Sequence, residues 1–168
     1  CIYCHNRDML DLKNYTAFSA EELINKIVQY KPYFGDKGGV TISGGDPFFQ
    51  PKFLLELVRL CKKNKINVTL DTCLFTTKES IDSVLPYVDV FMVSLKHFDP
   101  ETHKFLTGVS NERILENIKY ISDLPENKRP RIWLRYVVLP GYTDTKKNLS
   151  ALVSFLHKTN FELIELLP

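Results

Sequence analysis

Two kinds of hydrophobic spacing alternate along the chain. Ser19 and Glu22 form a capping box ahead of apolar residues at helical spacing, which predicts a helix that ends in the glycine-rich segment 35–39. Short runs rich in β-branched and other apolar residues then alternate with longer segments that carry a helical apolar stripe. The predicted strands span residues 40–43, 67–72, 90–96, 131–138 and 162–167, and the predicted helices that follow span 53–63, 78–87, 111–122 and 145–158.

This order of elements indicates an α/β fold with parallel strands. A helix precedes the first of the five strands, so we expect at least one earlier strand before Cys1 and treat the chain as an internal fragment. Both an open doubly wound sheet and a partial (β/α) barrel agree with the order of elements alone. Nothing in the sequence suggests a linker or an internal repeat, so a single domain over residues 1–168 is expected.

The two faces of the strands favour the barrel. In the third strand, Phe91, Val93 and Leu95 share a face that suits packing beneath helices, whereas the opposite face turns polar by Lys96. The fourth strand repeats this pattern, with Arg135 on the polar face. Polar side chains near the C-terminal ends of parallel strands, directed away from the helices, are typical of an active site at the mouth of a barrel.

Composition and charge exclude several classes of protein. The chain has 168 residues, of which 44% are hydrophobic and 12% aromatic, enough for a substantial core and against intrinsic disorder. A net charge of +2 lacks the basic excess of a nucleic-acid reader. No apolar run approaches the roughly 20 residues of a membrane span. We therefore expect a cytoplasmic protein that binds neither nucleic acid nor membrane.

Four cysteines offer candidate redox or metal chemistry. Without other signs of secretion, a disulfide framework is disfavoured, and the Cys1/Cys4 pair indicates metal binding or redox activity. Half of a zinc site or a thioredoxin-like dithiol remains an alternative for this pair. Cys61 lies on an apolar helical stripe and is expected in the core. A Schiff-base aldolase that uses Lys96 also fits a barrel mouth but leaves the cysteine pair unexplained.

A glycine pair directly follows the first predicted strand. Gly44 and Gly45 precede Asp46 and Pro47, and adjacent glycines permit a positive φ and a close approach of the backbone to a ligand. Their carbonyl groups can accept hydrogen bonds from an ammonium group. A plain tight turn is the alternative interpretation of this segment.

These motifs together resemble those of the radical S-adenosylmethionine superfamily. Its signature is Cys-x3-Cys-x-aromatic-Cys with a Gly-Gly-Glu-Pro turn, so the resemblance implies a further cysteine four positions before Cys1. Within the superfamily, the chain looks like an activase of glycyl radical enzymes, of the type that acts on pyruvate formate-lyase. The stretches that carry this finer resemblance are Tyr-Cys-His-Asn-Arg-Asp at 3–8, Leu-Asp-Thr at 70–72, Gly-Val-Ser-Asn at 108–111, Arg-Tyr-Val-Val-Leu-Pro-Gly at 135–141 and Ile-Glu-Leu-Leu-Pro at 164–168.

The resemblance implies a role for each candidate residue. Cys1 and Cys4 would be two of three ligands of a 4Fe-4S cluster, with the aromatic ring of Tyr3 beside the adenine of S-adenosylmethionine. Lys96 and Arg135 would be the catalytic cations, which bind the cofactor carboxylate or the backbone of the partner. The expected ligands of the methionyl ammonium are Gly44, Gly45 and Asp46. The expected surroundings of a monovalent cation beside the cofactor are Asp71, Thr72 and the Met92 carbonyl, and Ser94 is also expected among the cofactor-binding residues.

The implied reaction is reductive cleavage of S-adenosylmethionine at the cluster, followed by removal of hydrogen from a glycine of the partner. The radical SAM type of partial barrel, truncated at both ends with its first strand missing, is the implied fold. No cysteine lies between His5 and Ser19, so the cysteine-rich insert of some other activases is absent, and a small electron donor such as flavodoxin or ferredoxin is expected. Such a reaction belongs to anaerobic metabolism.

Three departures from the family pattern leave alternatives open. Asp46 stands where a glutamate is usual, and Ser94 stands where these activases have an aspartate, which weakens the case for a bound cation. Cys73 and Leu74 replace a small or amide residue and a glycine, so a different turn is expected after Thr72. The alternatives are an activase of another glycyl radical enzyme and a degenerate relative that binds such an enzyme without catalysis.

Overall fold

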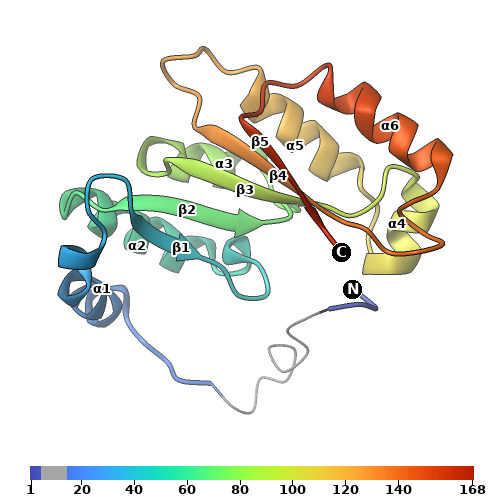
Figure 1. Cartoon of the computed structure of the whole chain (residues 1–168). Coiled ribbons are helices and arrows are strands. Elements are labelled where there is room, and N and C mark those ends of the chain that lie inside the picture. The colour runs from blue at the N-terminus through green and yellow to red at the C-terminus, as the bar shows by residue number, and fades with distance from the viewer. Residues whose placement is uncertain (5–14) are drawn as a thin grey trace.

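Five strands form one parallel sheet in the computed structural model, which describes residues 1–4 and 15–168 (Figure 1). Each strand is hydrogen-bonded to the next one in the chain, so the order is β1-β2-β3-β4-β5. The strands are β1 (Gly39–Ile42), β2 (Asn67–Thr72), β3 (Val90–Leu95), β4 (Arg131–Val137) and β5 (Leu163–Leu167). This confirms the predicted α/β fold with parallel strands, because each observed strand lies within one residue of its predicted bounds.

Within the described residues, six α-helices accompany the strands, and each β/α connection returns the chain to the next parallel strand. They are α1 (Ala20–Gln29), α2 (Pro51–Lys63), α3 (Lys78–Val84), α4 (Pro100–Thr107), α5 (Glu112–Ser122) and α6 (Lys146–Leu156). The predicted capping box begins α1, since Ser19 Oγ accepts from the Glu22 amide at 3.1 Å and Glu22 Oε2 accepts from the Ser19 amide at 2.8 Å. None of the helices among the described residues is long and apolar enough to cross a membrane.

Helix α4 is the one α-helix that the hydrophobic pattern did not predict. Its eight residues begin after Asp99, whose carboxylate accepts a hydrogen bond from the Thr102 amide at 2.9 Å. Pro100 occupies the first helical position, and Gly108 ends the helix with a φ of +93°. These terminal signals were present in the sequence, but the helix is too short to show a clear apolar period.

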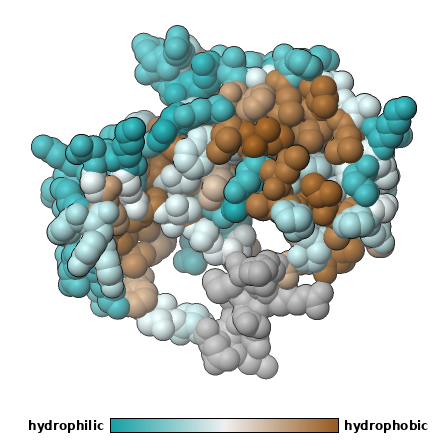
Figure 2. Space-filling view, in the orientation of Figure 1, coloured by the Kyte–Doolittle hydropathy of each residue, from teal (hydrophilic) through white to brown (hydrophobic). Residues whose placement is uncertain are grey.

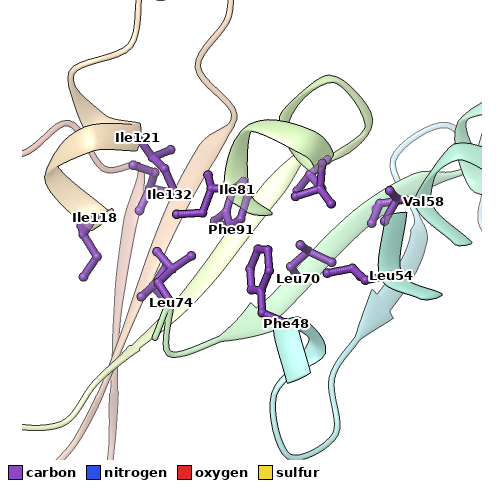
Figure 3. Close-up of a cluster of buried hydrophobic side chains, with 14 of the residues drawn as sticks. Phe48, Leu54, Val58, Leu70, Leu74, Ile81, Phe91, Ile118, Ile121 and Ile132 are labelled. Atoms are coloured by element: carbon purple, nitrogen blue, oxygen red, sulfur yellow. The ribbon is translucent and has the colours of Figure 1, made fainter. Parts of the chain in front are cut away.

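The core lies between one face of the sheet and the helices, as Figure 3 shows. Residues of β3 and β4 on this face are almost fully buried, whereas the intervening residues, apart from Val90 at the start of β3, are at least partly exposed. Burial of each such side chain contributes roughly 1.5–3 kcal/mol to the stability of the fold. The alternation therefore determines which face of each strand packs against the helices. The buried residues of the sheet and helices include Leu54, Val58, Leu70, Ile81, Phe91, Val93, Ile118, Ile121, Ile132 and Leu134.

The outer strand β5 differs from the central strands. Its side chains Leu163 and Leu166 are 47% and 60% exposed, and Leu149 and Val153 of α6 are also exposed. Figure 2 shows apolar surface gathered over this part of the molecule. The described residues therefore leave the β5 edge of the sheet and the adjacent face of α6 uncovered.

Candidate active site

Polar side chains from four successive strands meet near the C-terminal edge of the sheet, and Lys96 directly follows β3 there. The register places Ser94 of β3 beside Arg135 of β4, and Arg135 beside Glu165 of β5. Because Leu95 and the other core residues take the helix side, these polar side chains take the opposite face. The structure thus brings the predicted residues Arg135 and Asp71 together.

Arg135 joins two carboxylates. Its Nη1 lies 3.3 Å from Asp71 Oδ2, and its Nε donates to Glu165 Oε2 at 2.8 Å. The side chains of Arg135 and Asp71 are 26% and 28% exposed, so water screens this contact only in part. Glu165 was not among the predicted site residues, although alternation along the last strand places it on the same face as Arg135.

Burial shifts the protonation of two groups at this edge. Burial raises the pKa of Asp71, while the nearby charges of Arg135 and Lys96 partly offset this effect. Burial also lowers the pKa of Lys96, against the opposing influence of Cys73 and Asp71. None of the ion pairs formed by the described residues includes Lys96. Lys96 is therefore the cation that an anionic ligand such as a carboxylate can meet here.

The cysteine segment lies beside this cation. The Cys4 amide donates to the Cys1 carbonyl at 3.2 Å, and the Ile2 amide donates to the Leu106 carbonyl of α4 at 2.8 Å. Lys96 Nζ lies 5.8 Å from the centre of the Tyr3 ring, within cation–π range. The N-terminal residues thus bring the two thiols to the same edge of the sheet as the strand-end cations.

Tyr3 presents its two ends to different surroundings. Its hydroxyl oxygen is buried without a hydrogen-bond partner among the described residues, and burial raises the pKa of Tyr3 to about 12. Its ring faces Lys96, which agrees with the expected position beside a ligand. A buried hydroxyl with no partner costs stability, which is more often tolerated at functional sites than in plain cores.

The thiols of Cys1 and Cys4 are free, with Cys1 exposed and Cys4 half-buried. No group of three or more His, Cys, Asp or Glu side chains that could hold a metal is found in the described ranges 1–4 and 15–168. Two thiolates suit iron–sulfur or zinc chemistry but leave either site short of ligands. The pair therefore fits part of a cluster site, and the described residues offer no second pair that would complete a zinc site.

The predicted cation site is less clearly formed. Asp71 lies on the open face and pairs with Arg135, whereas Thr72 is 3% exposed and lies on the buried face. Their side chains diverge because they are neighbours on one strand. Ser94 lies on the open face, half-buried, next to Arg135 in the register. A bound cation at these residues stays a prediction.

The glycine turn after β1 is open to solvent. Gly44 has a φ of +132°, a conformation that favours glycine, and both Gly44 and Gly45 are exposed. A Cβ atom built on either residue would meet nothing within 4 Å. Backbone carbonyls in such an open turn are accessible to a ligand, and their binding of an ammonium group stays a prediction.

The carboxylate of Asp46 faces the turn after β2 instead of this open space. Thr72 Oγ1 donates to Asp46 Oδ2 at 2.8 Å, and the Cys73 amide donates to the same oxygen at 2.8 Å. The Cys73 thiol lies 3.2 Å from it. Hydrogen bonding to Asp46 was not predicted for Cys73, and only a juxtaposition of two loops could reveal it.

Leu74 keeps a left-handed backbone. Its φ is +59°, and its side chain is fully buried. The structure accommodates leucine in a conformation that favours glycine, because burial of the side chain offsets backbone strain of about 1–3 kcal/mol. That this turn differs from the one usual in the family stays a prediction. Asn117 of α5 also stabilises this turn by donating to the carbonyls of Leu74 and Thr76 at 2.9 and 2.8 Å.

A cavity of about 820 Å³ lies on the other side of Lys96, between α4 and the start of α6. His97, which follows Lys96 in the chain, lines it together with the stacked rings of Phe105 and Tyr142. None of the predicted cofactor ligands lines this cavity. The predicted site is therefore the sheet edge itself and not this cavity.

The thiols are expected to differ sharply in reactivity. Burial raises the pKa of Cys73 to about 12 and that of Cys61 to about 11. Around pH 8 the Cys73 thiol therefore stays protonated, whereas alkylating reagents attack the thiolate form. Iodoacetamide added to anaerobic, metal-free protein should label Cys1 and Cys4 first, as read by peptide mass spectrometry. Fast native labelling of Cys73 would contradict its observed surroundings.

Comparison with known proteins gives consistent results. The family model "Radical SAM superfamily" matches residues 1–152. The pyruvate formate-lyase 1-activating enzyme of Escherichia coli K12 is 40% identical over 172 residues, covering 100% of this chain and 68% of that protein. The pyruvate formate-lyase-activating enzyme of Clostridium pasteurianum is 34% identical over 170 residues, covering 100% of this chain and 69% of that protein.

Solved structures show the same fold. A domain of a pyruvate-formate lyase-activating enzyme from Bacteroides vulgatus superposes with a TM-score of 0.70 at 30% identity, over 77% of this chain and 80% of that chain. Streptococcus suis SuiB, solved with bound S-adenosylmethionine, superposes with a TM-score of 0.73 over 93% of this chain and 35% of its own. SuiB is 20% identical and supports the fold alone.

Proposed function

Because this chain belongs to the radical SAM superfamily and, within it, to the pyruvate formate-lyase activating enzymes, we propose that it activates pyruvate formate-lyase by removing hydrogen from a glycine of that partner. The observation that carries this proposal is the meeting of Cys1, Cys4, Lys96 and Arg135 at one edge of the parallel sheet. A cation without an ion pair among the described residues, beside free thiols, suits a cluster-bound cofactor that carries a carboxylate.

Cys1 and Cys4 would supply two of the three thiolates that hold a 4Fe-4S cluster. When bound, the cluster and S-adenosylmethionine together supply a one-electron cleavage that yields a hydrogen-abstracting radical. Lys96 would bind the carboxylate of the methionyl group, since it has no ion pair among the described residues. The open carbonyls of Gly44 and Gly45 would receive the ammonium, and the ring of Tyr3 would face the adenine.

Arg135 has a different role from Lys96. Its guanidinium already forms ion pairs with both Asp71 and Glu165, so it holds the open face of β2, β4 and β5 in one arrangement. We infer two roles for Arg135. It keeps the carboxylates of Asp71 and Glu165 from pairing with the ammonium group of Lys96, and it donates its remaining N–H groups to the backbone of the partner. Arg135 thereby leaves Lys96 available to the cofactor.

The segment after β4 is the proposed entry for the glycine loop of the partner. Pro140 and Gly141 turn the chain there, with a φ of +79° at Gly141. The exposed rings of Phe105 and Tyr142 stack beside this turn, and aromatic side chains are enriched where proteins bind one another. A small electron carrier such as flavodoxin or ferredoxin would reduce the cluster in the cytoplasm.

Electron paramagnetic resonance tests this function directly. Full-length protein, reconstituted without oxygen and supplied with reductant, S-adenosylmethionine and pyruvate formate-lyase, should produce a glycyl radical on the partner together with 5′-deoxyadenosine. If 5′-deoxyadenosine forms without a radical on pyruvate formate-lyase, the protein cleaves S-adenosylmethionine, but its partner is another glycyl radical enzyme. Neither signal from protein with an intact cluster would identify a degenerate binding protein.

A further inference from the structure

The carboxylate of Asp46 receives hydrogen bonds from two different turns. Within its own turn, Asp46 Oδ1 accepts from the Phe48 amide at 3.0 Å. From the turn after β2, Thr72 Oγ1 reaches both carboxylate oxygens, at 2.8 and 3.1 Å, and Cys73 reaches Oδ2 with its amide at 2.8 Å and its thiol at 3.2 Å. Asp46 thus links residues that are 26 and 27 positions apart in the chain.

These donors fill the hydrogen-bond acceptor positions of the Asp46 carboxylate. An ionised carboxylate has about four lone-pair positions. The Phe48 amide, the Thr72 hydroxyl, the Cys73 amide and the Cys73 thiol each supply one hydrogen. An ammonium group could bind Asp46 only by displacing one of them, which would leave that donor without a hydrogen-bond partner.

The two glycines in front of Asp46 are in the opposite situation. Within the described residues, no hydrogen bond of the turns and loops is accepted by the carbonyl of Gly44 or Gly45. Both are exposed, with open space around them. Unused acceptors therefore lie beside a carboxylate whose acceptor positions are filled.

The second turn is itself held on its far side. Thr72 Oγ1 accepts from the Leu74 amide at 2.9 Å while donating to Asp46, and Asn117 donates to the Leu74 carbonyl at 2.9 Å. Asn117 is 2% exposed and belongs to α5. Asp46 is thereby joined through this turn to a helix in the core.

We propose that Cys73 is a positioning residue for cofactor binding, in that its thiol and amide hold the Asp46 carboxylate and so fix the Gly44-Gly45 turn with its carbonyls directed to the ammonium group. This inference rests on the proposed function. Asp46 contributes by orienting the glycine turn, and the glycine carbonyls make the contact with the ammonium. Asp46 meets Cys73 through both its backbone amide and its thiol.

The protonation of the thiol agrees with this role. Burial raises the pKa of Cys73 to about 12, and the charge of Asp46 adds to the shift. The sulfur therefore carries its hydrogen throughout the ordinary pH range and remains a donor to Asp46. A thiolate at this position would repel the carboxylate instead.

Cys73→Ala in the full-length, cluster-containing enzyme separates the two possible roles of Asp46. If Asp46 positions the turn, loss of the thiol loosens it and S-adenosylmethionine should bind about three- to tenfold more weakly, as for one lost hydrogen bond. If Asp46 binds the ammonium directly, the substitution frees an acceptor position and affinity should stay constant or rise. Isothermal titration calorimetry under argon measures the difference, and Cys73→Ser should restore most of the affinity.

A readout without the cofactor keeps this test separate from the proposed function. In cofactor-free protein, amide hydrogen exchange at Phe48 and residue 73 should accelerate about three- to tenfold in Cys73→Ala, because the bond network there opens more often. Cys61→Ala serves as the control, since it removes a fully buried thiol from α2 and should lower the melting temperature without affecting exchange at Phe48 or affinity.

Three results would overturn the positioning role of Cys73. These are unchanged or tighter binding in Cys73→Ala, unchanged exchange at Phe48, and an affinity loss no larger than that of Cys61→Ala. Failure of the wild-type enzyme to form deoxyadenosine would instead count against the proposed function, and the exchange experiment would still decide how Asp46 is held.

Discussion

Cys4→Ser should remove at least about nine-tenths of the cluster iron from anaerobically purified, full-length enzyme. Changes to residues that merely support a metal ligand already cost 10–100-fold in metal affinity, and removal of a ligand costs at least as much. Cys4 is held beside Lys96 and the sheet edge by its turn with Cys1, so no other described thiol can replace it without moving this segment. Iron and sulfide analysis with absorption spectroscopy measures the loss.

Cys73→Ser is the matched control for Cys4→Ser. Cys73 is bonded to Asp46 and belongs to the second turn, so its replacement should leave the iron content unchanged. Full iron content in Cys4→Ser would reject Cys4 as a ligand. Zinc without sulfide in the wild-type enzyme would show that the cysteine pair is a structural site.

Arg135→Ala is expected to slow cleavage of S-adenosylmethionine by about 10²–10³, as when a preorganised charged or donor group is removed from an active site. The substitution leaves Asp71 and Glu165 without their shared cation, so their negative charge turns toward Lys96 and the bound carboxylate. The free energy of unfolding should change by only about 1 kcal/mol, because partly exposed ion pairs contribute little. Deoxyadenosine assays and thermal melts separate the two effects.

Arg131→Ala is the control for Arg135→Ala. Arg131 lies on the same strand at its N-terminal end and pairs loosely with Glu162 at 3.8 Å, away from the site. Arg131→Ala should leave cleavage of S-adenosylmethionine unchanged.

Lys96→Ala should slow cleavage about as much as Arg135→Ala does, and it should also weaken cofactor binding. A large fall in melting temperature with normal cleavage would make the strand-end cations structural.

The sequence predicted correctly those features of the fold that depend on the local spacing of hydrophobic residues. Alternation along β3 and β4 correctly assigned Phe91 and Leu134 to the core, and Arg135 to the open face, because a one-residue error would exchange the faces. Predictions of short elements were weaker. Helix α4 was missed because its eight residues give few apolar repeats, although its proline and glycine boundaries were visible.

The sequence also indicated candidate site residues, whose roles stay predictions, but it did not indicate how they pair. It indicated Asp71 as a cation ligand, whereas the structure pairs it with Arg135. It suggested that Asp46 meets the ammonium, whereas the structure directs its carboxylate to Thr72 and Cys73. Glu165 was absent from the prediction because a single carboxylate in a strand has no distinctive local pattern.

By itself, the sequence determined the order of strands and helices, the face that each central strand buries, and the positions of the thiols, glycines and cations. Those properties follow from spacings of two to four residues, which the chain shows before it folds. Only the tertiary structure decided which polar groups meet. Arg135 and Asp71 are 64 positions apart, and Asp46 and Cys73 are 27 apart, so their contacts depend on the parallel register and on the connections between strands. No local sequence pattern encodes contacts between residues so far apart in the chain, because the pairing of the strands and the packing of the whole core bring these residues together.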